Sequence, residues 1–148
     1  MVQPSKATWA APSAQPSPKY IRSTQPHIQK TALTPSQELI SELGASKVAV
    51  QGVDYEATVE SNALLGSGGG PVMAQLAQQA IKNCPNTKIA ISGYSQGGEV
   101  VHYAVQQAGL SPSIVSSAVI YGDPEDGTPV GSLPASKLKE FCVWIPYF

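Results

Sequence analysis

The sequence predicts an α/β fold, in which helices cover both faces of a small parallel sheet as a three-layer sandwich. Helix-like and strand-like segments alternate along the chain, and the candidate strands are almost continuously apolar, as in buried parallel sheets. With 148 residues, the chain is long enough for one domain and short for two. No run approaches the roughly 18 apolar residues that a membrane helix needs, so no transmembrane segment is expected.

The composition changes near residue 34. Residues 1–34 contain four basic and no acidic side chains, whereas all 13 glycines and all ten acidic residues come later. A segment rich in Pro, Ser and Gln cannot bury enough apolar surface to offset its chain entropy. We therefore expect a disordered low-complexity segment at 1–34 and a partial α/β domain at 35–148. The net charge of −1, without a basic run, argues against a nucleic-acid partner.

The first ordered elements are expected to be a helix and a strand. Thr34 can cap a helix, Pro35 suits its first position, and Gly44 is a natural stop. Residues 47–51 should form a short strand, and the glycine-rich residues 66–70 a flexible loop. The other expected elements are a helix at 71–83 with Val72, Leu76, Ala80 and Ile81 on its apolar face, a helix at 96–109, and strands at 87–92, 114–121 and 141–145.

A G-x-S-x-G motif at residues 93–97 lies between an expected strand and an expected helix. This context favours a nucleophile elbow, a sharp turn that lifts the Ser95 hydroxyl above the carboxyl edge of the sheet. The backbone N–H of Gln96 could then donate to an oxyanion at the start of the helix. Glycines are expected at 93 and 97 because side chains there would collide with the neighbouring strand or helix, and Gly97 and Gly98 should let the helix approach the sheet closely. The alternative is a tight turn with an inert serine.

A nucleophilic serine needs a base, and the chain has two histidines. One, His27, lies in the low-complexity segment. The other, His102, comes about two turns after Ser95 on the same helix, so it is a weak candidate for the base and fits a surface or core histidine better. Asp123 is a weak candidate for the acid, because its Gly-Asp-Pro setting equally suits a turn in which it accepts backbone N–H groups.

No metal or other cofactor is expected. Two cysteines are too few for a four-thiolate zinc site or a disulfide-dense fold. A nucleotide site at residues 67–70 is a further alternative, although no Gly-Lys-Ser/Thr follows these glycines.

From about residue 45 to Cys142, the chain resembles a fungal cutinase or cutinase-like serine esterase. The stretches that carry the resemblance are 50–55 (VQGVDY), 61–71 (SNALLGSGGGP), 84–86 (CPN), 93–98 (GYSQGG) and 121–124 (YGDP). The resemblance implies a small α/β-hydrolase fold, a secreted protein without a cofactor, and hydrolysis of cutin, lipid or short acyl esters. It also implies that Ser95 is the nucleophile, that the Gln96 N–H is one oxyanion donor, and that Asp123 is structural.

The sequence departs from the family pattern at both ends. The Arg-Gly-Thr/Ser segment that supplies the second oxyanion contact is not found in residues 1–34, and the family's acid and base segments do not follow Cys142. The family resemblance also leaves Cys84 and Cys142 without their partners, as buried free thiols that could join two chains in a non-native dimer. The sequence therefore predicts either an impaired, truncated serine esterase or a catalytically inactive cutinase-like fragment.

Overall fold

The computed structural model describes residues 35–142 of the chain. These residues belong to two compact units, which divide between Val50 and Gln51. The low-complexity segment expected at 1–34 and residues 143–145 of the expected last strand lie outside the described residues.

In the first unit, helix α1 (Pro35–Leu43) begins and ends where the sequence predicts. Gly44 has a φ of 90°, and its N–H donates to the carbonyl of Ile40 at 2.9 Å, which closes the last turn. The strand expected at 47–51 is wrong: this segment is a turn followed by irregular chain, and Val50 is 59% exposed. Strand preference reflects packing against neighbours, and none of the three described strands pairs with this segment.

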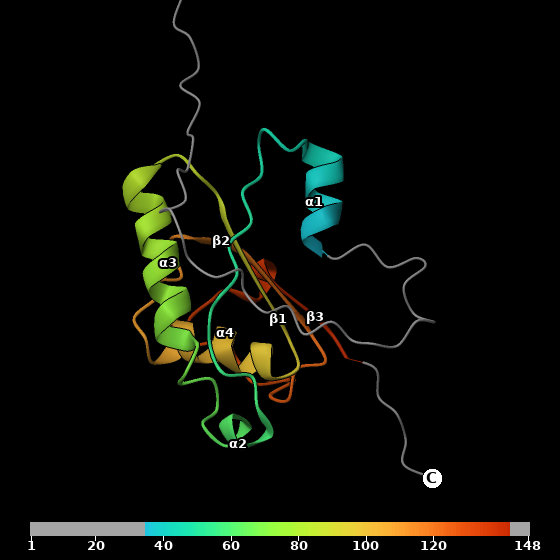
Figure 1. The fold of residues 1–148 in the computed structure, drawn as a ribbon, viewed down its shortest axis with the longest axis vertical. Coiled ribbons are helices and arrows are strands. Elements are labelled where there is room, and N and C mark those ends of the chain that lie inside the picture. The colour runs from blue at the N-terminus through green and yellow to red at the C-terminus, as the bar shows by residue number, and fades with distance from the viewer. Residues whose placement is uncertain (1–34, 143–148) are drawn as a thin grey trace, which may run out of the picture. The chain divides into compact units, whose positions relative to one another are not determined.

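The second unit contains a three-stranded parallel sheet in the order β1-β2-β3. This confirms the predicted parallel α/β class; coverage of both faces of the sheet remains a prediction. The elements in chain order are α2 (Val59–Asn62), α3 (Gly70–Asn83), β1 (Ile89–Tyr94), α4 (Gln96–Gln106), β2 (Val115–Tyr121), a 3-10 turn (Ala135–Lys137) and β3 (Leu138–Phe141) (Figure 1). The last strand begins three residues earlier than predicted, directly after the 3-10 turn.

The strand register brings three chain segments to one edge of the sheet. Tyr94 pairs with Tyr121, which pairs in turn with Phe141, so the three strands end side by side. The rings of Tyr121 and Phe141 stack with centroids 5.2 Å apart. Because the strands are parallel, this is their common carboxyl edge, where Ser95 and Asp123 follow.

The core of this unit lies between the sheet and helix α4, which contacts β1 and β2, while α3 packs on α4. The face predicted for α3 is displaced: the predicted residues are half-buried, and the fully buried ones are Gly70, Met73, Ala74 and Ala77. Small residues lie there because the helices approach closely; a Cβ at Gly70 would come within 2.5 Å of the Tyr103 ring. The core residues are Met73, Ala74, Ala77, Ile91, Val100, Val101, Ala104, Leu110, Val115, Ala118, Ile120, Val130 and Leu133. Among the described helices, none is long and apolar enough to cross a bilayer.

Candidate active site

Ser95 occupies a strained turn between β1 and α4. Its φ of 51° and ψ of −121° put a non-glycine residue in a backbone region that L-residues rarely adopt. The turn is fixed from both sides, since the Ser95 N–H donates to the carbonyl of Tyr121 at 2.8 Å and its carbonyl accepts the N–H of Gly98 at 2.7 Å. Ser95 is exposed. The strand, strained serine and helix reproduce the geometry of a nucleophile elbow.

Two glycines allow this turn, but they are not quite the two that the motif predicts. A Cβ at Gly93 would lie 2.1 Å from the carbonyl oxygen of Gly97, so position 93 must remain glycine. At Gly97 a Cβ would meet only the Tyr55 hydroxyl at 3.8 Å, so the predicted collision there is wrong. The crowded position is Gly98, where a Cβ would approach Ile120 at 2.8 Å and Asp123 at 2.9 Å.

Gln96 contributes both its backbone and its side chain to the site. Its N–H belongs to the first turn of α4, where N–H groups have no intrahelical acceptor and can face an anion. Its side-chain Nε2 donates to Ser61 Oγ at 2.9 Å and to the Thr58 carbonyl at 3.5 Å. Thr58 and Ser61 form the capping box of α2, a short helix that the sequence analysis missed.

We expect Gln96→Leu to loosen the contact between α2 and the Ser95 turn. The substitution removes the amide donor while nearly preserving the side chain's size, so the cost should be about 1 kcal/mol. Urea unfolding would measure it. In a double-mutant cycle with Ser61→Ala, the two costs should not add, because both variants delete the same hydrogen bond; strict additivity would contradict the contact.

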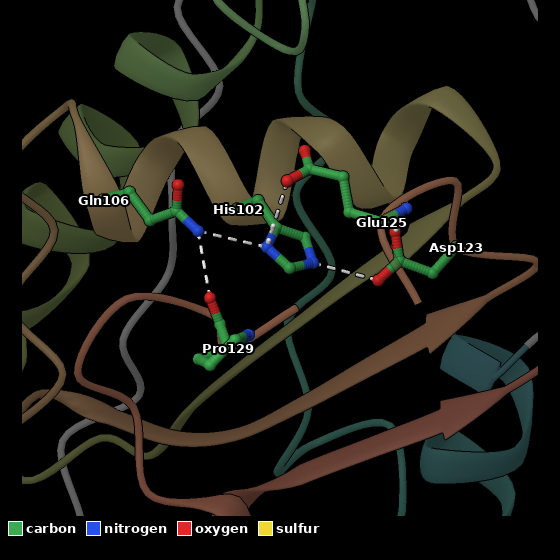
Figure 2. Close-up of polar contacts among 5 residues, drawn as sticks. All are labelled: His102, Gln106, Asp123, Glu125 and Pro129. Carbon is green, nitrogen blue, oxygen red and sulfur yellow. Dashed lines mark hydrogen bonds and ion pairs between the residues drawn. The ribbon is translucent and has the colours of Figure 1, made fainter. Parts of the chain in front are cut away.

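His102 is buried in the core and joined to Asp123. Its exposed fraction is 1%, and Nε2 lies 3.0 Å from Asp123 Oδ2 (Figure 2). Its other nitrogen, Nδ1, lies 3.3 Å from Gln106 Nε2, which also donates to the Pro129 carbonyl at 3.0 Å. Nδ1 also lies 3.8 Å from Glu125 Oε2, so the carboxylates of Asp123 and Glu125 flank the two ring nitrogens (Figure 2).

This arrangement does not bring His102 to Ser95. Both ring nitrogens of His102 are engaged, and the ring lies within the core rather than at the exposed serine. Asp123 also serves the turn in which it lies, because its Oδ1 accepts the backbone N–H of Glu125 at 3.0 Å. The structure thus brings together the two weak candidates for base and acid, but at each other and not at the candidate nucleophile; their roles in catalysis remain predictions. The other histidine, His27, lies outside the described residues.

Acidic side chains surround the pair of His102 and Asp123. Glu140 Oε1 and Glu99 Oε2 are buried atoms without a hydrogen-bond partner in the described structure. Burial raises the pKa of Glu99, and the charges of Glu125 and Asp123 add to the effect. Burial also raises the pKa of Glu140, with further contributions from its hydrogen bond to Asp123 and from the charges of Asp123 and Asp126. One ring nitrogen of His102 and one carboxylate oxygen each of Asp123 and Glu140 all lie within 4.8 Å of one another. Hydrogen bonding accounts for this proximity, which does not by itself define a metal site.

Sequence reasoning missed Glu99 and Glu140, because single acidic residues are usually solvated. A signal was available for Glu140, since it shares one strand face with Leu138 through the two-residue period.

The cysteine expectations held in part. Cys84 and Cys142 are both free, but neither is fully buried, since Cys84 is half-buried and Cys142 is exposed.

Comparison with known proteins gives one consistent family. The family model for cutinase matches residues 21–144. Cutinase 4 of Emericella nidulans is 45% identical over 105 residues, which are 71% of this chain and 45% of that protein. The cutinase of Monilinia fructicola is 44% identical over 106 residues, covering 70% of this chain and 52% of that protein.

A solved structure agrees. Trichoderma reesei cutinase, in complex with a C11Y4 phosphonate inhibitor, is similar with a TM-score of 0.66 and 35% identity. The match covers 73% of this chain and 50% of that one. The chain therefore spans about half the length of the relatives that it matches.

Proposed function

The chain belongs to the cutinase family, and we propose that it acts as a carboxylic ester hydrolase with Ser95 as the nucleophile. The observation that carries this proposal is the strained, exposed Ser95 between a buried strand and the N-terminus of α4. The substrate class would be cutin, lipid or short acyl esters, and the protein would act outside the cell. Both expectations rest on family membership. A dimer joined through Cys84 or Cys142 remains a prediction.

The proposed chemistry is acyl transfer to serine. Ser95 Oγ would attack the ester carbonyl, and its proton would pass to a base as the carbonyl oxygen becomes negative. The Gln96 N–H, at the positive end of α4, is placed to donate to that oxygen. The intermediate would then collapse and expel the alcohol, which takes the proton held by the base. Attack of water on the acyl-serine would release the carboxylic acid and restore Ser95. No cofactor is needed for any of these steps.

Two candidate functions differ in whether the protein supplies a base for Ser95. The alternative to an impaired esterase is a cutinase-like protein without catalytic activity. One observation favours it: the histidine that the structure describes, His102, is buried and engaged through both ring nitrogens. A serine without a base retains only the rate that oxyanion donation and binding provide.

The test is labelling with a fluorophosphonate probe, which forms a bond with an activated serine. We expect the chain to be labelled at Ser95 about a thousandfold or more slowly than Trichoderma reesei cutinase, because the histidine within residues 35–142, His102, is not positioned at the serine. The Ser95→Ala variant should not be labelled. Equal labelling of this variant and the parent would contradict Ser95 as the nucleophile. Complete absence of labelling in a chain shown to be folded by circular dichroism would support the inactive alternative.

A further inference from the structure

Three elements meet at one cluster of titratable side chains, in which His102 and Asp123 are buried and Glu140 is half-buried. His102 comes from α4, Asp123 from the turn that follows β2, and Glu140 from β3. One donor atom from each lies within 4.8 Å of the others. Glu140 Oε1 is buried in the described structure without a hydrogen-bond partner, which is costly for an ionised carboxylate. Two carboxyl groups as close as this are tolerated when one of them is protonated.

We propose that Glu140, Asp123 and His102 form one proton-sharing unit, which holds β3 against α4 and the Asp123 turn while Glu140 is protonated and releases β3 when that proton is lost. In this unit Glu140 donates to Asp123, and Asp123 also accepts the Nε2–H of His102. At alkaline pH the Glu140 proton passes to water, and two carboxylates remain side by side. The unit would therefore act as an acid-stabilised latch.

The charges that face Glu140 support the proposal. Asp123 and Asp126 face it from the turn after β2, and His102 faces it from α4. The charge of His102 acts in the opposite direction and is the smallest of the contributions to the pKa of Glu140. Lys139, the cation on the same strand, is directed elsewhere: its Nζ lies over the Phe141 ring, 5.5 Å from the ring centroid.

The wider surroundings are also acidic. Glu99 from α4 and Glu125 from the turn add negative charge around Asp123. Cys142, the next residue after β3, is exposed, but it lies in the same field: partial desolvation, and then the charges of Asp126 and Asp123, raise the pKa of its thiol.

The sign of the pH effect follows from the direction of the Glu140 shift. Burial, the hydrogen bond with Asp123 and the charges of Asp123 and Asp126 raise the pKa of Glu140 in the folded state, and His102 opposes them as the smallest cause. A carboxyl with a raised pKa stabilises the fold in acid. That stability is lost as the pH rises through the folded-state pKa.

Release of β3 would reach the Ser95 turn through the backbone. The Gly122 N–H donates to the Phe141 carbonyl at 2.8 Å, directly beside the Asp123 carboxyl. The preceding carbonyl, that of Tyr121, accepts the N–H of Ser95 at 2.8 Å. The latch and the candidate nucleophile thus share one short stretch of chain at the carboxyl end of β2.

The test compares thermal unfolding of the parent chain and Glu140→Gln from pH 4.5 to 8.5. Glutamine keeps an N–H donor toward Asp123 but cannot ionise, so the variant should lack this pH effect. We expect the parent to lose about 5 °C or more in Tm relative to Glu140→Gln over this range, with no advantage for the variant at the acid end. The exposed Glu42→Gln serves as the matched control and should follow the parent. Parallel curves for the parent and Glu140→Gln would overturn the proposal.

A second measurement needs no variant. Amide hydrogen exchange of the parent at pH 5 and pH 8, corrected for the intrinsic rate, should show protection of residues 138–142 falling about tenfold at pH 8, with α3 unchanged. Equal protection of β3 at the two pH values would overturn the latch, even if Glu140→Gln does not fold. Neither measurement depends on whether Ser95 is catalytic.

Discussion

Gly93→Ala should destabilise the chain by about 4 kcal/mol or more, a loss close to the total stability of a marginal domain. The added Cβ would lie 2.1 Å from the carbonyl oxygen of Gly97 and 2.7 Å from the nitrogen of Gly98. Both are backbone atoms in the first turn of α4, so no side-chain rotation can relieve the contact. The helix would have to move away from β1, and the packing of the core residues of α4 would be lost.

Urea unfolding followed by circular dichroism measures this loss. The matched control is Gly68→Ala, because a Cβ at Gly68 would meet no atom within 4 Å. That control should change the free energy of unfolding by about 0.5 kcal/mol or less. Similar costs for the two variants would show that the turn is not held as tightly as the Gly93 contact requires.

The elbow was predictable from sequence because its causes are local. An apolar strand, two glycines and an amphipathic helix follow one another directly, and this order predicts both the turn and the exposure of Ser95. Helix α1 was equally local, since Pro35 and Gly44 mark its two ends. The strand expected at 47–51 failed for the opposite reason, because a strand needs a partner and the composition of five residues cannot supply one.

The acidic cluster depends on the tertiary fold. His102 and Asp123 are 21 residues apart, and Glu140 comes from another strand again. Isolated Asp and Glu residues usually face solvent, so the sequence predicted a turn for Asp123 and nothing for Glu140. Only the parallel register, which ends β2 and β3 side by side, brings these carboxyl groups together beneath α4.

The buried face of α3 also depends on tertiary packing, which the sequence pattern alone does not show. Hydrophobicity favoured Val72 and Leu76, yet the buried side carries Gly70, Ala74 and Ala77. Close helix packing selects small residues, and the choice is visible only once Tyr103 and Val100 of α4 are seen to occupy the space. The glycine-rich segment before α3 is thereby explained by packing, because side chains at Gly69 and Gly70 would collide with α4.

Asp123→Ala should cost about 3 to 5 kcal/mol, because it leaves buried donors without an acceptor. Asp123 accepts the Nε2–H of His102 and the backbone N–H of Glu125 through different oxygens. His102 is 1% exposed and Asp123 is 7% exposed, so water cannot readily replace the lost carboxylate. Asp123→Asn keeps one carbonyl oxygen, and about half of the loss should be recovered.

The measurement is urea unfolding of the parent and the variants at one pH. The exposed Asp126→Ala is the matched control from the same turn, and it should stay within about 0.5 kcal/mol of the parent. A double-mutant cycle of Asp123→Ala with His102→Phe should give a coupling free energy of about 1.5 to 3 kcal/mol. A loss below about 1 kcal/mol for Asp123→Ala would mean that the buried pair is replaceable, so that α4 is held to the sheet by apolar packing alone.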